Sequence, residues 1–286
     1  MKFFYFFLIG FFVFLETNGQ LQSNEKQVLI DFYEATNGAF WTEKWNLQEP
    51  IENWKGVSLE NGFVTHIVLP ENNLTGYLPV SLFKLEKLKE LNLHLNSIGG
   101  ELPLNIGDAK RLIVLDLTLN ELEGSLPKSI VNLTGIKKIL LSMNKLTGNI
   151  PKEIYYLQNL EVLGLNSNYL KGSIDEISWD MPKLRELDLS NNKFEGTIPR
   201  KMGKLKNLEK FMIFQNNFKG KISIELISLK KLKSLNLASN QLSGSIPKDI
   251  LTLKDLRCLF LSGNNFNNTV DFSAMNHAHI TAFEVK

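Results

Sequence analysis

The chain of 286 residues contains one cysteine, Cys258, so no disulfide can form within it. Small exported domains often depend on disulfides, but a chain of this length can bury a core that replaces them. The sequence also has little charge excess, since its 32 basic and 30 acidic residues give a formal charge of +2. This balance argues against a nucleic acid or a membrane surface as the partner. We therefore expect a fold held together by packing.

Long apolar runs are confined to the amino terminus. Lys2 is followed by thirteen apolar residues, Phe3 to Leu15, and Thr17 and Gly19 provide the small residues of a cleavage site. This pattern predicts a signal peptide over residues 1–19, because a transmembrane helix needs roughly 20 apolar residues. An uncleaved anchor is the alternative. No later segment is long enough to span a membrane, so we expect the remainder to be exported and soluble.

Leucine recurs with a period of 24 residues. Nine full blocks begin at Val64, Leu88, Leu112, Ile136, Leu160, Leu184, Leu208, Leu232 and Leu256, and a truncated tenth begins at Ile280. Block eight, LKSLNLASNQLSGSIPKDILTLKD, shows the pattern most clearly. A single block cannot bury its own leucines, whereas stacked blocks share a continuous core. The period therefore predicts a solenoid.

Each block position has a physical role. Residues at positions 4 and 6 alternate with polar ones and predict a short strand with two inward side chains. Gly at position 13 permits unusual backbone angles, and Pro at 16 precedes a short helical or 3₁₀ segment closed by apolar residues at 19 and 22. Position 9 is an inward asparagine, which must bind backbone groups of adjacent turns. These asparagines are Asn72, Asn96, Asn120, Asn144, Asn168, Asn192, Asn216, Asn240 and Asn264.

The pattern LxxLxLxxNxLxGxIPxxIxxLxx resembles the plant-type class of leucine-rich repeats over residues 63–286. The resemblance implies an α/β solenoid with a concave parallel sheet and a 3₁₀ or irregular convex side. The pattern is similar to exported polygalacturonase-inhibiting proteins and receptor-kinase ectodomains, which bind partners and rarely catalyse. Local irregularity is expected in the blocks where Asp175, Ser223 and Asp271 replace the proline, where Asn268 replaces the glycine, and where Ile177 and Trp179 shift the back segment.

Residues 20–62 resemble the amino-terminal cap of such repeats. NEKQVLIDFYEATNG reads as an amphipathic helix, with Asn24 as N-cap and Asn37-Gly38 as its stop. Trp41, Trp45 and Trp54 follow and are expected to cover the first open turn. Plant caps of this kind carry paired cysteines, and their absence here favours a bacterial or other non-plant exported relative.

Signals for chemistry are weak, and no catalytic, metal or cofactor site is predicted. His66, Glu71, Glu90, His94 and Asp116 fall on adjacent predicted strands and form a titratable candidate, with a solvated strand surface as the alternative. His277 and His279 read as a solvated turn rather than a metal site. Asn73, Asn132 and Asn267 begin glycosylation sequons, which matter only in a glycosylating host.

Lysines gather where each back segment returns to its strand. They are Lys84, Lys87, Lys137, Lys138, Lys204, Lys206, Lys230, Lys231 and Lys233. This column offers either a basic flank for an acidic glycan or protein, or charges that aid solubility; the near-neutral total favours solubility.

Position 8 is expected to face the concave surface, because Asn at 9 must point inward and two adjacent residues of an extended chain cannot both do so. Six blocks have Glu, Ser, Asn, Gln or Gly there, but Leu95, Leu119 and Met143 occupy it in three successive blocks. A contiguous apolar patch usually marks a binding site. The predicted binding patch therefore joins these three to Val114 and Leu140, with a second group at Met212, Phe214 and Phe260.

These patterns predict an exported binding protein without enzymatic activity that recognises a protein or polysaccharide partner through its concave face. One alternative is adsorption to ice or a crystalline polysaccharide, although mixed residue columns fit that role poorly. A metal-assisted hydrolase using the cluster from His66 to Asp116 is a third.

Overall fold

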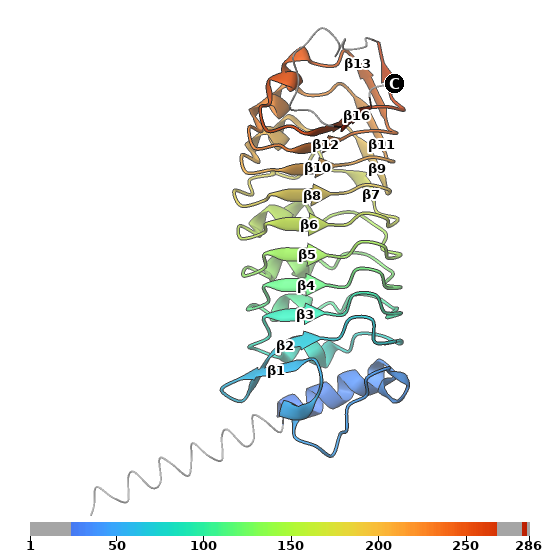
Figure 1. The fold of residues 1–286 in the computed structure, drawn as a ribbon, viewed down its shortest axis with the longest axis vertical. Helices are drawn as coiled ribbons and strands as arrows, with labels where there is room; N and C mark the ends of the chain where they lie inside the picture. Colours follow the sequence, from blue (N-terminus) through green and yellow to red (C-terminus); the bar gives the residue numbers. More distant parts are fainter. Residues whose placement is uncertain (1–23, 268–281, 285–286) are drawn as a thin grey trace, which may run out of the picture.

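The structure, a computed structural model, describes residues 24–267 and 282–284 as an elongated stack of turns (Figure 1). One long sheet runs along the stack, and each 24-residue block adds one strand. The predicted signal peptide, Asn268, Asp271, His277 and His279 lie outside the described residues.

The long sheet confirms the predicted parallel arrangement. Neighbouring strands pair in parallel and in register, so that Glu90 lies beside Val114 and Val114 beside Lys138. The exception is the first pair, which is antiparallel and joined by Asn61 and Gly62, both with positive φ as a tight hairpin turn requires. In order, the strands are β1 (Val57–Glu60), β2 (Phe63–Val68), β3 (Glu90–Asn92), β4 (Val114–Asp116), β5 (Lys138–Leu140), β6 (Val162–Gly164), β8 (Glu186–Asp188), β10 (Lys210–Met212), β12 (Ser234–Asn236), β14 (Cys258–Phe260) and β16 (Ala282–Glu284).

Short 3₁₀ helices form the back of the stack, as the pattern predicts. They are η3 (Val80–Lys84), η4 (Ile106–Asp108), η5 (Lys128–Asn132), η6 (Lys152–Tyr156), η7 (Arg200–Lys204), η8 (Ile224–Ser228) and η9 (Lys248–Thr252). Block five has no such helix between residues 176 and 180. There Asp175 replaces the proline, and Trp179 is fully buried with a left-handed backbone, so its indole fills the back of the turn.

A second parallel sheet runs along the later blocks, and the sequence pattern did not predict it. Its strands are β7 (Lys171–Ser173), β9 (Lys193–Gly196), β11 (Asn217–Gly220), β13 (Gln241–Gly244) and β15 (Asn265–Phe266). Blocks one to four make only isolated bridges at the same place, such as Tyr77 with Gly99. The glycine at position 13 is required here: Gly196 has φ 86°, and a Cβ on it would lie 2.7 Å from Ser173 Oγ.

The core is one column of inward leucine and isoleucine side chains closed by the asparagines. Leu91 and Leu93, at positions 4 and 6, are fully buried. Asn120 shows the polar part: its Oδ1 accepts from the Ile98 amide at 3.0 Å, and its Nδ2 donates to the carbonyls of Leu93 and Leu117 at 2.9 and 3.1 Å. All nine position-9 asparagines donate in this way to backbone carbonyls. Each side chain therefore joins adjacent turns.

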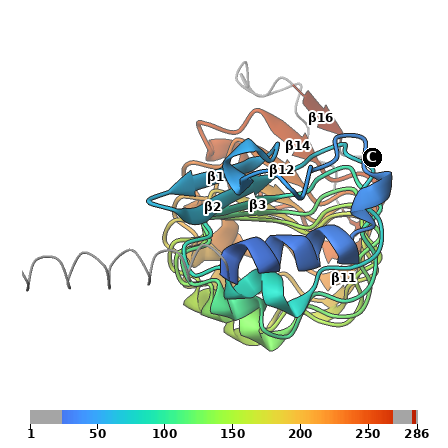
Figure 2. The same cartoon turned by 90° about the horizontal axis from the view of Figure 1, so that it is seen from below.

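Residues before the first repeat cover the open end of the stack (Figure 2). Residues 24–35 form the amphipathic α-helix, so Asn24 is already helical and does not cap it, while Asn37 adopts a left-handed conformation just after the helix. Two 3₁₀ turns follow, η1 (Gly38–Phe40) and η2 (Ile51–Asn53).

Tryptophans fill this end. Trp41, Trp45 and Trp54 are buried, and the rings of Trp45 and Trp54 stack at 4.8 Å. The asparagine ladder also continues into the covering segment, because Asn72 Oδ1 accepts from the Glu43 amide at 2.6 Å. Apolar stacking and backbone pairing together protect the first turn from solvent.

Candidate binding surface

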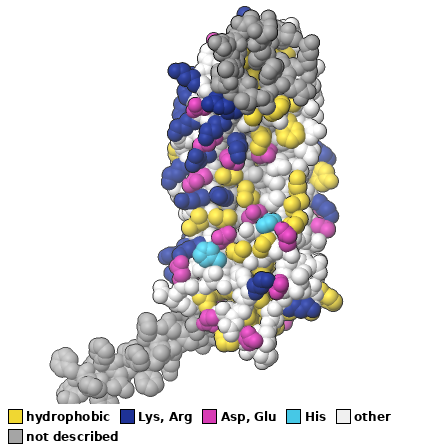
Figure 3. Space-filling view, viewed as in Figure 1, with side chains coloured by type: hydrophobic (Ala, Val, Ile, Leu, Met, Phe, Trp, Pro, Cys, Tyr) yellow, Lys and Arg dark blue, Asp and Glu magenta, His cyan; other side chains and the backbone are white. Residues whose placement is uncertain are grey.

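The outward face of the long sheet, called here the sheet face, displays positions 3, 5, 7 and 8 of every block (Figure 3). Strand residues alternate on it: in β4, Val114 and Asp116 are half-buried while Leu115 between them is fully buried. Apolar side chains gather over its middle, and Lys and Arg crowd the edge at which the upper strands begin (Figure 3).

Position 8 has a left-handed backbone in all nine blocks, with φ between 52° and 64°. Its side chains are outward, as predicted, but for a different reason. The chain is no longer extended after the strand, so the residue turns out of the sheet instead of alternating. Such a conformation favours Gly, Asn and other short polar residues. It explains why six blocks place Glu71, Ser167, Asn191, Gln215, Ser239 and Gly263 there.

Leu95, Leu119 and Met143 break this rule in three successive blocks. They are 43%, 40% and 48% exposed, and each holds the left-handed conformation. They stack along the sheet, because the Leu95 amide donates to Thr118 O and the Leu119 amide to Ser142 O, both at 2.9 Å. An unbranched or γ-branched apolar residue gains no local hydrogen bond there, so the conformation costs roughly 1 kcal/mol each. We call these three residues the apolar column.

The other predicted patch residues are less closely grouped. Val114 lies between Glu90 and Lys138 in the register, and Leu140 lies between Asp116 and Gly164. The five predicted patch residues outside the apolar column are half-buried, whereas the three residues of the apolar column are exposed. The five are Val114, Leu140, Met212, Phe214 and Phe260.

In the second group, Met212 and Phe214 share one strand end. Phe260 is separated from Met212 by Asn236 of the intervening strand. The structure therefore brings together the three position-8 residues and the Met212–Phe214 pair, but not all eight predicted residues.

A polar stretch separates the two groups. Ser142 Oγ donates to Asn166 Oδ1 at 2.5 Å, and Gly164 between them is buried. Asp188 lies between Gly164 and Met212, and its carboxylate accepts from the Ser190 amide at 3.0 Å. Burial of Asp188 raises the pKa of its carboxyl group. The stretch of the sheet face between the two apolar groups is therefore polar, and its side chains are largely engaged in their own hydrogen bonds.

The titratable candidate is spread along the sheet face. His66 Nδ1 is 2.9 Å from Thr65 Oγ1, and His94 Nδ1 is 3.0 Å from Asn92 Oδ1, so both rings are engaged locally. Within residues 24–267, no three His, Cys, Asp or Glu side chains are placed to hold a metal ion. His66 lies beside Glu90 in the register, and the Glu71 amide donates to the His94 carbonyl at 3.0 Å.

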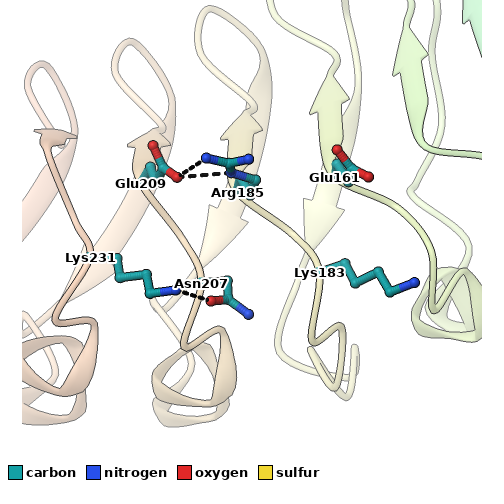
Figure 4. Close-up of a pocket in the computed structure, with 6 residues that line it drawn as sticks. All are labelled: Glu161, Lys183, Arg185, Asn207, Glu209 and Lys231. Atoms are coloured by element: carbon teal, nitrogen blue, oxygen red, sulfur yellow. Dashed lines mark hydrogen bonds and ion pairs between the residues drawn. The ribbon is translucent and has the colours of Figure 1, made fainter.

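A charged pocket of about 360 Å³ opens at the edge where the strands begin (Figure 4). It is lined by Glu161, Lys183, Arg185, Asn207, Glu209 and Lys231. Arg185 donates twice to Glu209 Oε1, at 2.8 and 2.5 Å, and Lys231 Nζ donates to Asn207 Oδ1 at 2.7 Å (Figure 4). Lys233 and Arg185 both donate to Glu209 and hold the pKa of that carboxyl group below its usual range. Ion pairs therefore engage Arg185 and Glu209 in this pocket, whereas Lys183 and Lys231 donate to the side-chain oxygens of Asn159 and Asn207.

Comparison with known proteins identifies leucine-rich repeats in the chain. A family model described as "Leucine Rich repeats (2 copies)" matches residues 158–200, and one described as "Leucine Rich Repeat" matches residues 87–109 and 231–253. The chain carries leucine-rich repeats whose pattern resembles the plant-type class. It is similar to the probable inactive receptor kinase RLK902 of Arabidopsis thaliana, with 36% identity over 85 residues. That match covers 29% of this chain and 13% of the kinase.

Solved structures share the leucine-rich repeat solenoid fold. The HAESA receptor-kinase ectodomain of Arabidopsis, in complex with an extended IDA peptide hormone ligand, is 31% identical with a TM-score of 0.79. The match covers 93% of this repeat chain but 45% of HAESA. A plant ice-binding protein has a TM-score of 0.71 and is covered to 95%, but at 22% identity it shows the shared fold alone.

Sequence reasoning missed the left-handed conformation of position 8, although a signal was present. A column that repeatedly holds Ser, Asn, Gln and Gly is typical of a positive φ. The ion pairs of Glu209 with Arg185 and Lys233 were also missed. They join position-2 residues of adjacent blocks, which become neighbours only when the blocks are stacked.

Proposed function

We propose that this chain is a binding protein without enzymatic activity, that it acts outside the cytoplasm, and that it recognises a protein partner with the sheet face. Residues 1–19 serve as the export signal and residues 20–62 as the cap of the repeat domain at 63–286. Among the described residues, no helix has the length and apolar character to cross a membrane. Support comes from the similar HAESA ectodomain, which binds a peptide hormone. The polysaccharide alternative is weaker here, because the prominent feature of the sheet face is apolar.

The apolar column is the observation that carries the proposal. Leu95, Leu119 and Met143 combine an unfavourable backbone conformation with side chains that are 40–48% exposed. Neither property stabilises the fold, and six other blocks show that the scaffold accepts polar residues at the same position. A residue that breaks a local rule without a structural gain points to function. Buried against a partner, each side chain could contribute about 1–2 kcal/mol.

The test uses two triple variants that each remove three exposed apolar side chains. The first, L95S/L119S/M143S, places serine where Ser167 and Ser239 already occur. The second, V80S/L104S/I224S, removes the residues at position 17 on the back of the stack, which are 61%, 79% and 49% exposed.

Purified wild-type and variant proteins are incubated with the native extracellular fluid, and captured proteins are quantified by mass spectrometry. We expect a protein that is retained by the wild type and the position-17 variant and lost by the column variant, with all three melting normally. Equal capture by both variants would contradict the proposal. A column variant that melts well below the wild type would show that position 8 supports the core instead.

A further inference from the structure

A second surface, distinct from the sheet face, carries uncompensated positive charge. Lys206, Lys230 and Lys254 occupy position 23 of three successive blocks and are all exposed. Each lies four residues before a strand begins, and those strands start at Lys210, Ser234 and Cys258, which pair in register. The three lysines are therefore stacked along the edge of the long sheet at the spacing of its strands, about 4.8 Å. We call them the lysine column.

In the neighbouring column at position 2, charged side chains neutralise one another by forming ion pairs. Glu161 is 3.6 Å from Lys137 Nζ, and Glu209 binds both Arg185 and Lys233, the latter at 2.6 Å. From Lys137 to Lys233, bases and acids alternate along that column and pair across adjacent blocks. Glu161 and Glu209 are thus already engaged, and the acidic residue next to the lysine column in the chain is Asp255, which follows Lys254.

The lysine column has no such pairing. Within residues 24–267, none of its three ammonium groups lies within 4.0 Å of a carboxylate, and Lys204, which ends η7 on the same edge, also lacks an acidic partner there. Like charges stacked at this spacing repel one another, which does not help the fold.

The imbalance extends over the surrounding blocks. Residues 200–258 contain 13 basic and four acidic residues, a net charge of +9, while the rest of the chain carries −7. The total of +2 conceals this asymmetry, which is strong enough to attract a polyanion. Figure 3 shows the basic side chains crowding this edge of the upper blocks.

We propose that the lysine column binds a linear acidic polysaccharide, one that carries carboxylate or sulfate groups at regular intervals along its length. A row of cations with a regular spacing along a straight edge matches a chain of anions better than it matches a single one. Surfaces that bind single-stranded nucleic acids usually add aromatic side chains that stack on the bases. The segments 204–210, 228–234 and 252–258 contain no aromatic residue. They also expose no large apolar side chain that could enter a membrane.

This site is independent of the apolar column. The lysine column lies in the turns that lead into β10, β12 and β14, whereas the apolar column follows β3, β4 and β5. A protein partner on the sheet face and a polysaccharide at the edge could therefore be held together, and either proposal can fail without the other.

The test measures binding of the full-length mature protein to two polyanions, alginate for carboxylates and dextran sulfate for sulfates, with neutral dextran as the blank. The variant K206Q/K230Q/K254Q removes the lysine column. Its matched control, K128Q/K152Q/K248Q, removes three exposed lysines from position 17, so the net charge falls equally. Thermal melts establish that both variants are folded.

We expect one or both polyanions to bind, with affinity falling as salt increases. The column variant should lose on the order of 100-fold at low salt, since each lysine near an anionic surface contributes about a factor of five. Its slope of log affinity against log salt should fall by about one unit per lysine. The position-17 control should retain most of the affinity.

Three results would overturn the proposal: no binding to either polyanion, equal losses in the two variants, or tighter binding to double-stranded DNA or to phosphatidylserine vesicles. The second would mean that overall charge alone attracts the polymer. The third would assign the lysine column to a nucleic acid or a membrane instead.

Discussion

Blocks one to four and the blocks that follow block five share inward residues but differ on the outside. At position 6, Leu93 and Leu117 in the first group and Leu189 and Leu237 in the second are all fully buried. Outside, residues 64–159 are nearly neutral, with 10 basic and nine acidic residues, whereas residues 184–258 have 15 basic and seven acidic residues and carry +8. The first group has the apolar column, and the second has the lysine column and the second sheet.

This difference shows which positions the scaffold controls. Packing fixes the inward set in every block, because a stack cannot tolerate a gap in its core. Outward positions are free of that constraint, and so they can differ along the chain according to what they contact. The comparison separates the fold, which is repeated, from the candidate sites, which are not.

The largest effect is expected at the covered end of blocks one to four. Deletion of residues 20–62 would remove Trp41, Trp45 and Trp54 and uncover the fully buried Val64 and Leu74 of block one. We expect aggregation, because a solenoid with an open apolar end is not soluble. Soluble yield and a circular-dichroism melt check this. A soluble truncation that melts cooperatively would mean that the blocks do not need this cover.

Equivalent core substitutions test whether the inward sets are equal. Leu117→Ser in block three and Leu237→Ser in block eight each remove a fully buried side chain at position 6. Both should lower the free energy of unfolding by about 3–5 kcal/mol, through a cavity and an unpaired hydroxyl. Urea unfolding of the two proteins gives the comparison; Leu93→Ser serves as a replicate in block two. A much smaller loss in one block would show that the core is not uniform.

The asparagine ladder should give the next largest loss. Asn120→Ala would leave the Ile98 amide and the Leu93 carbonyl without their partner, and Asn240→Ala would do the same to Phe218 and Ile213. Each should cost about 2–4 kcal/mol, because the backbone groups that lose their partner remain buried. Hydrogen exchange should show faster exchange at the two amides named. Unchanged protection would indicate that water replaces the side chain.

Much of the fold follows from the sequence, because the repeat makes each prediction nine times. The strand at positions 3–5, the 3₁₀ segments and the helix over residues 24–35 all depend on local patterns that packing then confirms. The second sheet could not be predicted from the sequence, because the pairing of its strands from β7 onwards depends on how closely successive turns approach. Asp175, in place of the proline, predicted an irregular back segment in block five. The sequence did not predict that Trp179 is buried in a left-handed conformation.

The candidate sites were also predicted only in part, because block position indicates exposure but not backbone conformation or pairing between turns. Exposure of Leu95, Leu119 and Met143 followed from their block position, while the backbone strain that makes them unusual required the observed φ values. The sequence analysis included Lys206 and Lys230 among nine edge lysines but favoured solubility for them, and it did not include Lys254. The geometry of adjacent turns separates these three lysines from paired cations such as Lys233.

The smallest expected effect is also the one that tests the reading of position 8 most directly. Leu119 in block three and Asn191 in block six have the same left-handed backbone, with φ of 57° and 52°. Leu119→Asn should raise the free energy of unfolding by about 0.5–1 kcal/mol, because asparagine tolerates this conformation better than leucine does. Asn191→Leu should lower it by a similar amount, with a further small loss from its 3.2 Å hydrogen bond to Ser167. Thermal melts should move in opposite directions by roughly 1–4 °C. If both variants instead lose stability, Leu119 is stabilising where it stands, its exposure is no sign of a partner, and the apolar column belongs to the repeated scaffold rather than to the part of the surface that varies.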